Sequence, residues 1–197
     1  MYHIKSDKRS VRSSEWFFEA LEALMLETEY SKIKVIDLAD KAKLGRTTFY
    51  RNFDTIDDIL RMKCDEKLLG LKNYFMEYYK EAVLDTQGLF LKPFLNYWYV
   101  DSNIVELIIK ADKIDIFQVS FTNMVNEYRD LITTRNSDTT TNMVSLKNAN
   151  YINKIRVAVS ISILTEWIKN DKDVSPDELS EILISRLKNP INLDIFS

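Results

Sequence analysis

The side chains best suited to contact another molecule are gathered in one short stretch. From Lys41 to Phe53 the chain reads KAKLGRTTFYRNF, with four basic residues and no carboxylate. Arginine and asparagine can form paired hydrogen bonds with base edges, while threonine and tyrosine can contact phosphates or methyl groups. Because a carboxylate here would repel phosphate, the composition indicates a surface that meets a polyanion.

Helical spacing predicts which of these side chains face outward. Phe49 and Phe53 lie four residues apart, so we expect them on the inner face of a short helix. The outer face then carries Arg46, Thr47, Thr48, Tyr50, Arg51 and Asn52. Leu44 and Gly45 separate this helix from a shorter one before it, whose apolar residues are Val35, Leu38, Ala39 and Ala42.

A longer supporting helix is predicted before these two. Its apolar stripe is Trp16, Phe17, Ala20, Leu21 and Leu24. Ser13 or Ser14 is its expected N-cap. A longer helix followed by two short ones joined by a tight turn is the pattern of a helix-turn-helix unit, whose second short helix enters the DNA major groove.

Positive charge is concentrated at the front of the chain. The formal net charge is -3, yet the first 53 residues contain ten Lys or Arg and eight Asp or Glu. We expect an arm just before the first helix that contains Lys5, Lys8, Arg9 and Arg12. A basic front on an acidic remainder indicates that only the front meets a polyanion.

The rest of the chain is also predicted to be helical. Hydrophobic residues make up 46% of the sequence, there are three Gly and three Pro, and strand-like alternation is hard to find. Asp54 and Thr55 are expected to cap a long fourth helix with an apolar line formed by Leu60, Cys64, Leu68, Leu71, Phe75 and Tyr78. We predict an all-α fold in which residues 1–54 form a three-helix DNA-binding domain and residues 55–197 a helical domain joined to it by the fourth helix.

Two further signals place elements in the second half. The segment 133–142, TTRNSDTTTN, is polar throughout and is expected to be a surface loop. Ser175, Pro176 and Glu178 form the start signal of a last helix, with Ser175 as N-cap and Pro176 in the first helical position.

Catalytic and metal chemistry has few groups to use. His3 is the only histidine and lies in a terminus expected to be frayed, so a His-dependent triad has no residues to use. Cys64 is the only cysteine, which excludes an internal disulfide and a Cys-based metal site within one chain. We therefore expect no enzyme, no metal and no cofactor. The apolar runs are shorter than the roughly 20 residues of a membrane span. A single cysteine and the lack of a secretion signal fit a reducing, cytoplasmic setting.

The run from Val35 to Leu60, VIDLADKAKLGRTTFYRNFDTIDDIL, resembles the DNA-binding signature of the TetR family of bacterial transcriptional regulators. The resemblance is specific over about residues 10–62. It implies a homodimer that binds a double-stranded DNA operator, with a long fourth helix linking the DNA-reading part to a helical ligand-binding body. It also implies that an inducer in that body shifts the fourth helix, changes the separation of the two recognition helices and releases the operator.

The resemblance also assigns DNA contacts. Thr48, Tyr50 and Asn52 match positions that contact DNA or its phosphates. Three residues depart from the family pattern: Lys34 replaces a Thr or Ser cap, Lys43 a turn glycine, and Ile56 a lysine that often meets phosphate. The expected DNA-binding residues are Lys34, Lys43, Arg46, Thr47, Thr48, Tyr50, Arg51 and Asn52.

Aromatic and aliphatic residues of the second part suggest two more surfaces. An apolar or aromatic small-molecule effector could be lined by Phe94, Tyr97, Trp98, Phe117, Phe121, Tyr128 and Trp167, although the same rings could be ordinary core. The helix from Ile152 to Ile168 is apolar on two sides, so one flank is expected to face inward and one toward a partner. The expected dimer residues are Ile152, Ile155, Val159, Ile163, Trp167, Leu179, Ile182 and Leu183.

The sequence thus predicts a ligand-responsive DNA-binding regulator, a repressor that binds a near-palindromic operator as a homodimer. The alternative is a helical adaptor or small-molecule carrier that kept the fold without sequence-specific DNA binding. The departures at Lys34, Lys43 and Ile56 keep that alternative open.

Overall fold

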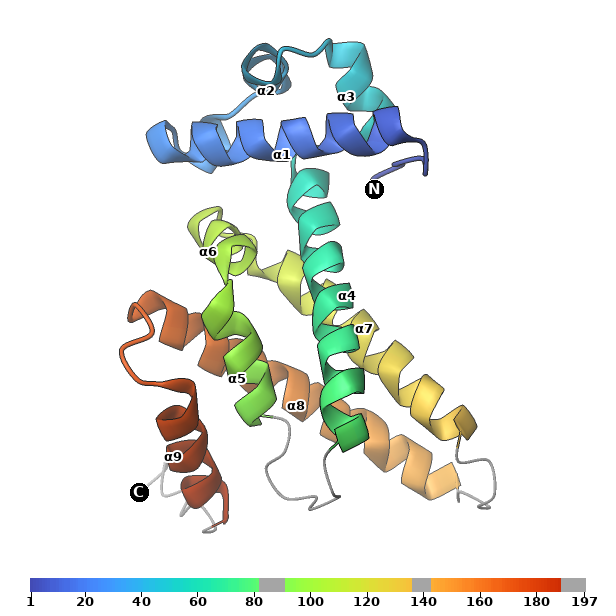
Figure 1. The fold of residues 1–197 in the computed structure, drawn as a ribbon, viewed down its shortest axis with the longest axis vertical. Coiled ribbons are helices and arrows are strands. Elements are labelled where there is room, and N and C mark those ends of the chain that lie inside the picture. Colours follow the sequence, from blue (N-terminus) through green and yellow to red (C-terminus); the bar gives the residue numbers. More distant parts are fainter. Residues whose placement is uncertain (82–90, 136–142, 189–197) are drawn as a thin grey trace.

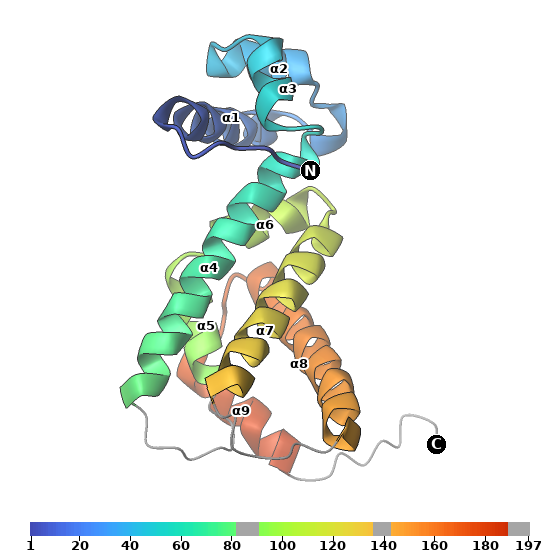
Figure 2. The same cartoon turned by 90° about the vertical axis from the view of Figure 1, so that its right-hand side faces the viewer.

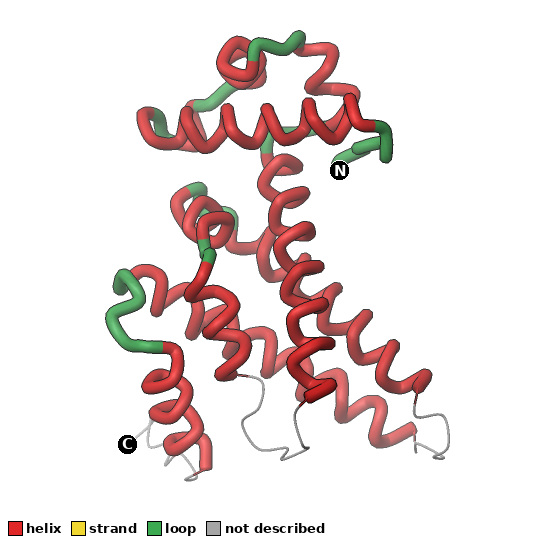
Figure 3. Tube along the Cα trace, viewed as in Figure 1, coloured by secondary structure: helices red, strands yellow, loops and turns green. Residues whose placement is uncertain are grey.

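The computed structural model describes residues 1–81, 91–135 and 143–188. Within these ranges the chain forms nine α-helices and one short 3-10 helix (Figure 3). In the same ranges, β-structure is limited to an isolated antiparallel bridge between Tyr2 and Phe53. The all-α prediction is confirmed.

Three α-helices and the 3-10 helix form a head at one end of the molecule (Figure 1). They are α1 (Lys8–Glu27), η1 (Tyr30–Lys32), α2 (Val35–Ala42) and α3 (Arg46–Asn52). Three phenylalanines form the centre of its core, since Phe17, Phe49 and Phe53 are fully buried. The rings of Phe49 and Phe53 both meet that of Phe17 edge to face, with centroids 5.4 and 6.1 Å away. The prediction that Phe49 and Phe53 point inward is confirmed.

The start of α1 differs from the prediction. Asp7 is its N-cap, because the carboxylate Oδ1 accepts the N–H groups of Arg9 at 3.1 Å and Ser10 at 2.9 Å. The predicted cap at Ser13 or Ser14 is therefore wrong, and both serines are buried inside the helix. Lys8, Arg9 and Arg12 consequently lie within α1 rather than in an arm before it.

Helix α4 (Asp57–Glu81) leaves the head and runs into the rest of the molecule (Figures 1 and 2). Asp58 stabilises its first turn, since the carboxylate Oδ2 accepts the N–H groups of Thr55 at 2.9 Å and Asp54 at 3.2 Å. An acidic residue is favoured there because the helix dipole is positive at its N-terminus. The predicted apolar line is buried at Leu60, Cys64, Leu68, Leu71 and Phe75.

The helices beyond α4 form the body. They are α5 (Leu91–Val100), α6 (Asn103–Lys110), α7 (Ile114–Arg135), α8 (Met143–Lys169) and α9 (Pro176–Lys188). Helix α4 packs against α6 and α7, α7 against α8, and α5 against α9 (Figure 2). None of the helices in the described ranges is both long and apolar enough to cross a membrane.

Two element boundaries in the body test the sequence analysis. The predicted loop 133–142 begins too early, because α7 continues to Arg135. Residues 136–142 lie outside the described part of the chain. The predicted start of α9 is confirmed, since the Ser175 hydroxyl accepts the N–H of Glu178 at 3.3 Å.

Candidate nucleic-acid interface

The outer face of α3 presents the side chains expected to meet DNA. Arg46, Thr47 and Arg51 are exposed, Thr48 is half-buried, and the Tyr50 ring is 58% exposed. The two buried phenylalanines hold the opposite face of the helix against α1. The arrangement therefore leaves two guanidinium groups, two hydroxyl groups and a phenol on one rigid, carboxylate-free surface.

Asn52 does not share this surface, and the prediction that it points outward is wrong. Its side chain is fully buried. The amide oxygen accepts the hydroxyl of Ser10 at 2.9 Å, and the amide nitrogen donates to the hydroxyl of Ser13 at 2.9 Å. Both serines belong to α1, so Asn52 fixes the end of α3 to α1 and has no group free for a base edge.

Two lysines flank the outer face of α3. Lys43 ends α2 in the left-handed region, with φ 55° and ψ 37°, where a residue with a Cβ pays roughly 1–2 kcal/mol. Lys34 precedes α2, and its N–H donates to the carboxylate of Asp37 at 2.8 Å. A lysine side chain has no acceptor for the helix N–H groups. In the described part of the chain, the only side-chain hydrogen bond of this cap is therefore the one that the Asp37 carboxylate accepts. Both lysines are exposed, as phosphate contacts require.

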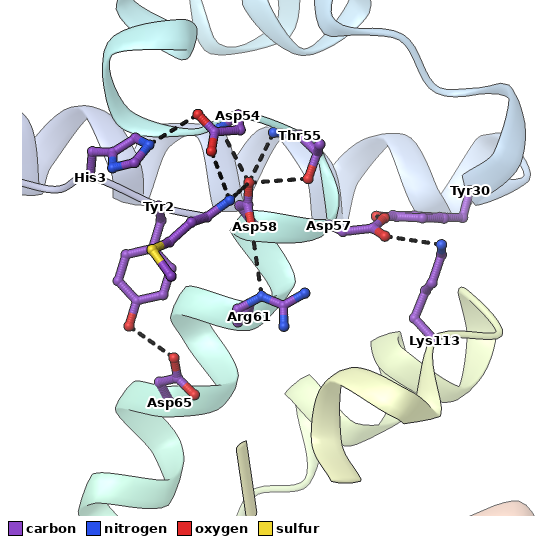
Figure 4. A network of polar contacts seen from close by, with 11 residues as sticks. Tyr2, His3, Tyr30, Asp54, Thr55, Asp57, Asp58, Arg61, Asp65 and Lys113 are labelled. Carbon is purple, nitrogen blue, oxygen red and sulfur yellow. Dashed lines mark hydrogen bonds and ion pairs between the residues drawn. The ribbon is translucent and has the colours of Figure 1, made fainter. Parts of the chain in front are cut away.

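Polar contacts around the start of α4 fix how this helix leaves the head (Figure 4). The amino group of Met1 donates to the carboxylates of Asp54 and Asp58, each at 2.9 Å, and the N–H of His3 donates to the carbonyl oxygen of Asn52 at 2.7 Å. Burial raises the pKa of Asp58, but the hydrogen bonds from Met1 and Thr55 outweigh it and hold the pKa below its usual range. The carboxylate thus stays charged at neutral pH.

The rings expected to line an effector site pack on one another in the body. Phe94, Trp98, Phe117 and Phe121 are all fully buried. Phe117 stacks on Phe121 with ring centroids 5.6 Å apart and lies 5.5 Å from the ring of Trp98. Such contacts are those of a core, so an effector role for these rings stays a prediction.

The other members of that set differ in position. Tyr97 is half-buried, and its hydroxyl donates to the carbonyl oxygen of Lys67 at 2.7 Å. Burial, with the charge of Asp101 as a smaller cause, raises the pKa of Tyr97 to about 12. The side chain of Tyr128 lies outside the described part of the chain. The Trp167 ring is buried and stacks on that of Tyr99, with centroids 6.0 Å apart.

The expected dimer residues divide into three groups. Ile155, Val159 and Ile182 are large apolar side chains that are 63%, 40% and 46% exposed. Ile163, Leu179 and Leu183 are half-buried. Trp167 is wrongly placed in the set, because its indole N–H donates to the carbonyl oxygen of Val174 at 2.8 Å and its ring faces the body. The side chain of Ile152 lies outside the described residues.

Sequence reasoning missed the two serines that hold Asn52. Ser10 and Ser13 lie two turns and one turn before Phe17, respectively, on the buried face of α1. Extending the apolar stripe of α1 toward its N-terminus by the helical period would have placed both hydroxyls in the head core. Buried hydroxyls need polar partners, which is the signal that could have identified Asn52 as one.

The family of this chain is established by its second half. A family of TetR type, described as "Transcriptional regulator C-terminal region", matches residues 85–189, which is more than half of the chain. Among curated proteins, none matches the chain significantly.

Solved structures share the architecture over nearly the whole length. A protein from Listeria innocua is 16% identical, with a TM-score of 0.68, and the match covers 94% of each chain. The fatty acid degradation regulator FadR from Bacillus halodurans is 15% identical, with a TM-score of 0.59, over 95% of this chain and 98% of its own. FadR from Bacillus subtilis, solved in complex with stearoyl-CoA, is 17% identical, with a TM-score of 0.56, over 90% of this chain and 99% of its own.

At these identities the likeness to solved structures establishes the fold alone. That fold is a helix-turn-helix head on a helical body. The family match over more than half of the chain shows that it belongs to the TetR family of transcriptional regulators.

Proposed function

We propose that this chain is a ligand-responsive transcriptional repressor that binds a near-palindromic operator as a homodimer. Residues 1–54 form the DNA-binding part and residues 55–197 the effector-binding and dimerisation part. The observation that supports DNA binding most directly is the outer face of α3, which is exposed at Arg46, Tyr50 and Arg51 and contains no carboxylate. In a dimer, the two α3 helices are expected to reach major grooves about 34 to 36 Å apart.

The chemistry of the body favours an apolar effector. Among the described residues of α5 to α9 and the turns between them, the buried polar side chains are serines and none is charged. The indole Nε1 of Trp98 is buried without a hydrogen-bond partner in the described part of the chain. An unpaired buried donor costs about 1–3 kcal/mol, and an acceptor on a largely apolar effector would remove that cost.

DNA binding is tested by selection of duplexes from a random library with the wild-type protein. The apparent Kd for the selected duplex and for a shuffled duplex of the same composition is then measured by fluorescence anisotropy at several salt concentrations. We expect the selected duplex to bind at least about 10³-fold more tightly, with an affinity that falls steeply with salt. Equal affinity for both duplexes, or no binding, would contradict the proposal and favour the adaptor or carrier alternative.

The effector class is tested in the same titration with stearoyl-CoA as the probe and coenzyme A as its matched control. An apolar effector site predicts that stearoyl-CoA weakens binding to the selected duplex while coenzyme A leaves it unchanged. If both compounds have the same effect, or if neither has any, a long acyl chain is not the feature that the body recognises.

A further inference from the structure

One carboxylate at the start of α4 contacts both the head and the body. Oδ1 of Asp57 accepts the hydroxyl of Tyr30 at 2.5 Å, and Oδ2 lies 3.0 Å from Nζ of Lys113 (Figure 4). Tyr30 belongs to η1 in the head, whereas Lys113 belongs to the turn between α6 and α7 in the body. Asp57 therefore joins three elements that are far apart in the sequence.

This contact is partly shielded from water. Lys113 and Asp57 are 36% and 34% exposed, and Tyr30 is half-buried. Burial, followed by the hydrogen bond to Asp57, raises the pKa of Tyr30, so its hydroxyl remains a donor at any physiological pH. Charge-assisted hydrogen bonds that are partly desolvated are stronger than ion pairs on an open surface.

Two more polar contacts join the head to the body. The side-chain amide of Asn103 donates to the carboxylate of Glu22 at 2.5 Å, and Nζ of Lys110 donates to the carbonyl oxygen of Met25. On the body side, all three partners lie in α6 or the turn that follows it. On the head side, they lie in the C-terminal half of α1 and in η1.

The other end of the head is attached differently. There the N-terminal segment and α1 contact α4, through the Tyr2 hydroxyl on Asp65 at 2.9 Å and the ion pair of Glu15 with Lys63 at 2.5 Å. The end that contains the tip of α3 is thus fixed to α4, while the opposite end rests on α6. A change in the position of α6 relative to α4 would therefore tilt the head.

We propose that Tyr30, Asp57 and Lys113 form a latch, completed by the contacts of Asn103 and Lys110, that fixes the orientation of the head on the body. Asp57 is its central positioning residue. The consequence for DNA binding rests on the proposed function, but the effect on head orientation does not. Opening the latch frees the head to tilt about its attachment to α4 while the folds of the head and body persist.

The orientation is measured by electron–electron distance spectroscopy between spin labels at Lys41→Cys in the head and Asn123→Cys in the body, both exposed positions. The native Cys64 stays unlabelled, because it is fully buried and burial raises its pKa to about 12. Labelled protein is mixed with excess unlabelled protein, so that any dimer carries one labelled chain.

The variants separate the two sides of the latch. Tyr30→Phe removes the contact with the head and Lys113→Met the contact with the body. Lys113→Arg keeps the charge and is expected to restore the wild-type distance. Lys92→Met is the matched control, because Lys92 pairs with Asp177 at the same distance of 3.0 Å but joins α5 to α9 within the body. Circular dichroism checks that each variant retains its helices.

We expect one narrow distance distribution for the wild type, Lys113→Arg and Lys92→Met, and a broader, displaced distribution for Tyr30→Phe and Lys113→Met. Unchanged distributions in both latch variants would overturn the proposal, as would equal broadening in Lys92→Met. The apparent Kd for the selected duplex is expected to change about fivefold or more in the latch variants. If the wild type selects no duplex, the proposed function fails, but the distance measurement still decides the latch.

Discussion

The side-chain amide of Asn52 holds α3 in place from inside the head. Its oxygen and nitrogen bond to Ser10 and Ser13, and the Ser13 hydroxyl also donates to the carbonyl oxygen of Ser10 at 2.9 Å. A buried network of this kind is satisfied only while every member is present. We therefore expect Asn52 to affect the proposed DNA binding only through the position of α3.

Replacing Asn52 by Ala is expected to lower the free energy of unfolding by about 2 kcal/mol, because two buried serines lose a partner and a cavity forms. The measurement is urea unfolding followed by circular dichroism. Thr47→Ala, an exposed change on the same helix, is the control and should stay within about 0.5 kcal/mol of the wild type. If Asn52→Ala is as stable as Thr47→Ala, the hydrogen bonds of Asn52 to α1 do not stabilise the head.

At the scale of single residues, the sequence predicts which apolar side chains are buried better than it predicts the partners of a polar side chain. The periodicity of Phe49 and Phe53 identified the buried face of α3 correctly, because two apolar residues four positions apart are a local signal. The burial of Asn52 depends on hydroxyls more than thirty residues earlier in the chain. No pattern within α3 contains that information, so the same amide looked suitable for a base edge.

Among the elements, α4 and α5 approach closely at Gly70. A Cβ built on Gly70 would lie 2.5 Å from the Tyr97 hydroxyl oxygen and 3.6 Å from the ring carbon that carries it. The hydroxyl is held in place by its hydrogen bond to the carbonyl oxygen of Lys67. Glycine at this position therefore serves close packing between the two helices, at some cost in helix propensity.

Gly70→Ala is consequently expected to be neutral or destabilising in the wild type, where the methyl group displaces the Tyr97 hydroxyl. In a Tyr97→Phe background the nearest atom is at ordinary contact distance, and the same change should stabilise the protein by about 0.5–1 kcal/mol through helix propensity. Thermal unfolding of the four proteins in this double-mutant cycle measures the difference. Equal effects of Gly70→Ala in both backgrounds would show that the hydroxyl does not set the spacing of the helices.

The head helices, α4, α8 and α9 were predictable because each carries its own apolar residues at helical spacing, and α9 also has its own cap at Ser175. Boundaries were predicted less well. The start of α1 was placed too late because Asp7 competes with Ser13 and Ser14 as a cap, and the two serines face the core. The placement of α6 under the head was not predictable, since it rests on contacts such as Asp57 with Lys113, which are distant in sequence.

On the scale of the whole molecule, α8 and α9 present apolar side chains that the described chain does not cover. Tyr151, Ile155 and Val159 are spaced by four residues along one side of α8, and Ile182 is exposed on α9. On another side of α8, Val157, Ile161 and Leu164 are buried. A helix with an inward apolar face and an exposed one is suited to pack against a second copy of the chain.

A glutamate in place of Ile155 is therefore expected to shift the protein from dimer to monomer, because the interface would bury an unpaired charge. Sedimentation analysis over a range of protein concentrations measures the shift. Leu26→Glu places the same charge at an exposed apolar position in the head and should leave the association unchanged. A dimer that persists in Ile155→Glu would place the subunit contact elsewhere.

The central claim is that the outer face of α3 reads DNA while its phenylalanines hold it to the head. The most direct measurement is the affinity of Arg46→Ala and Tyr50→Ala for the selected duplex, compared with Lys169→Ala, which removes an exposed charge in the body, at the C-terminal end of α8. We predict that each α3 variant binds about tenfold more weakly or worse, with unchanged thermal stability, and that Lys169→Ala binds as the wild type does. Wild-type affinity in both α3 variants would contradict the account.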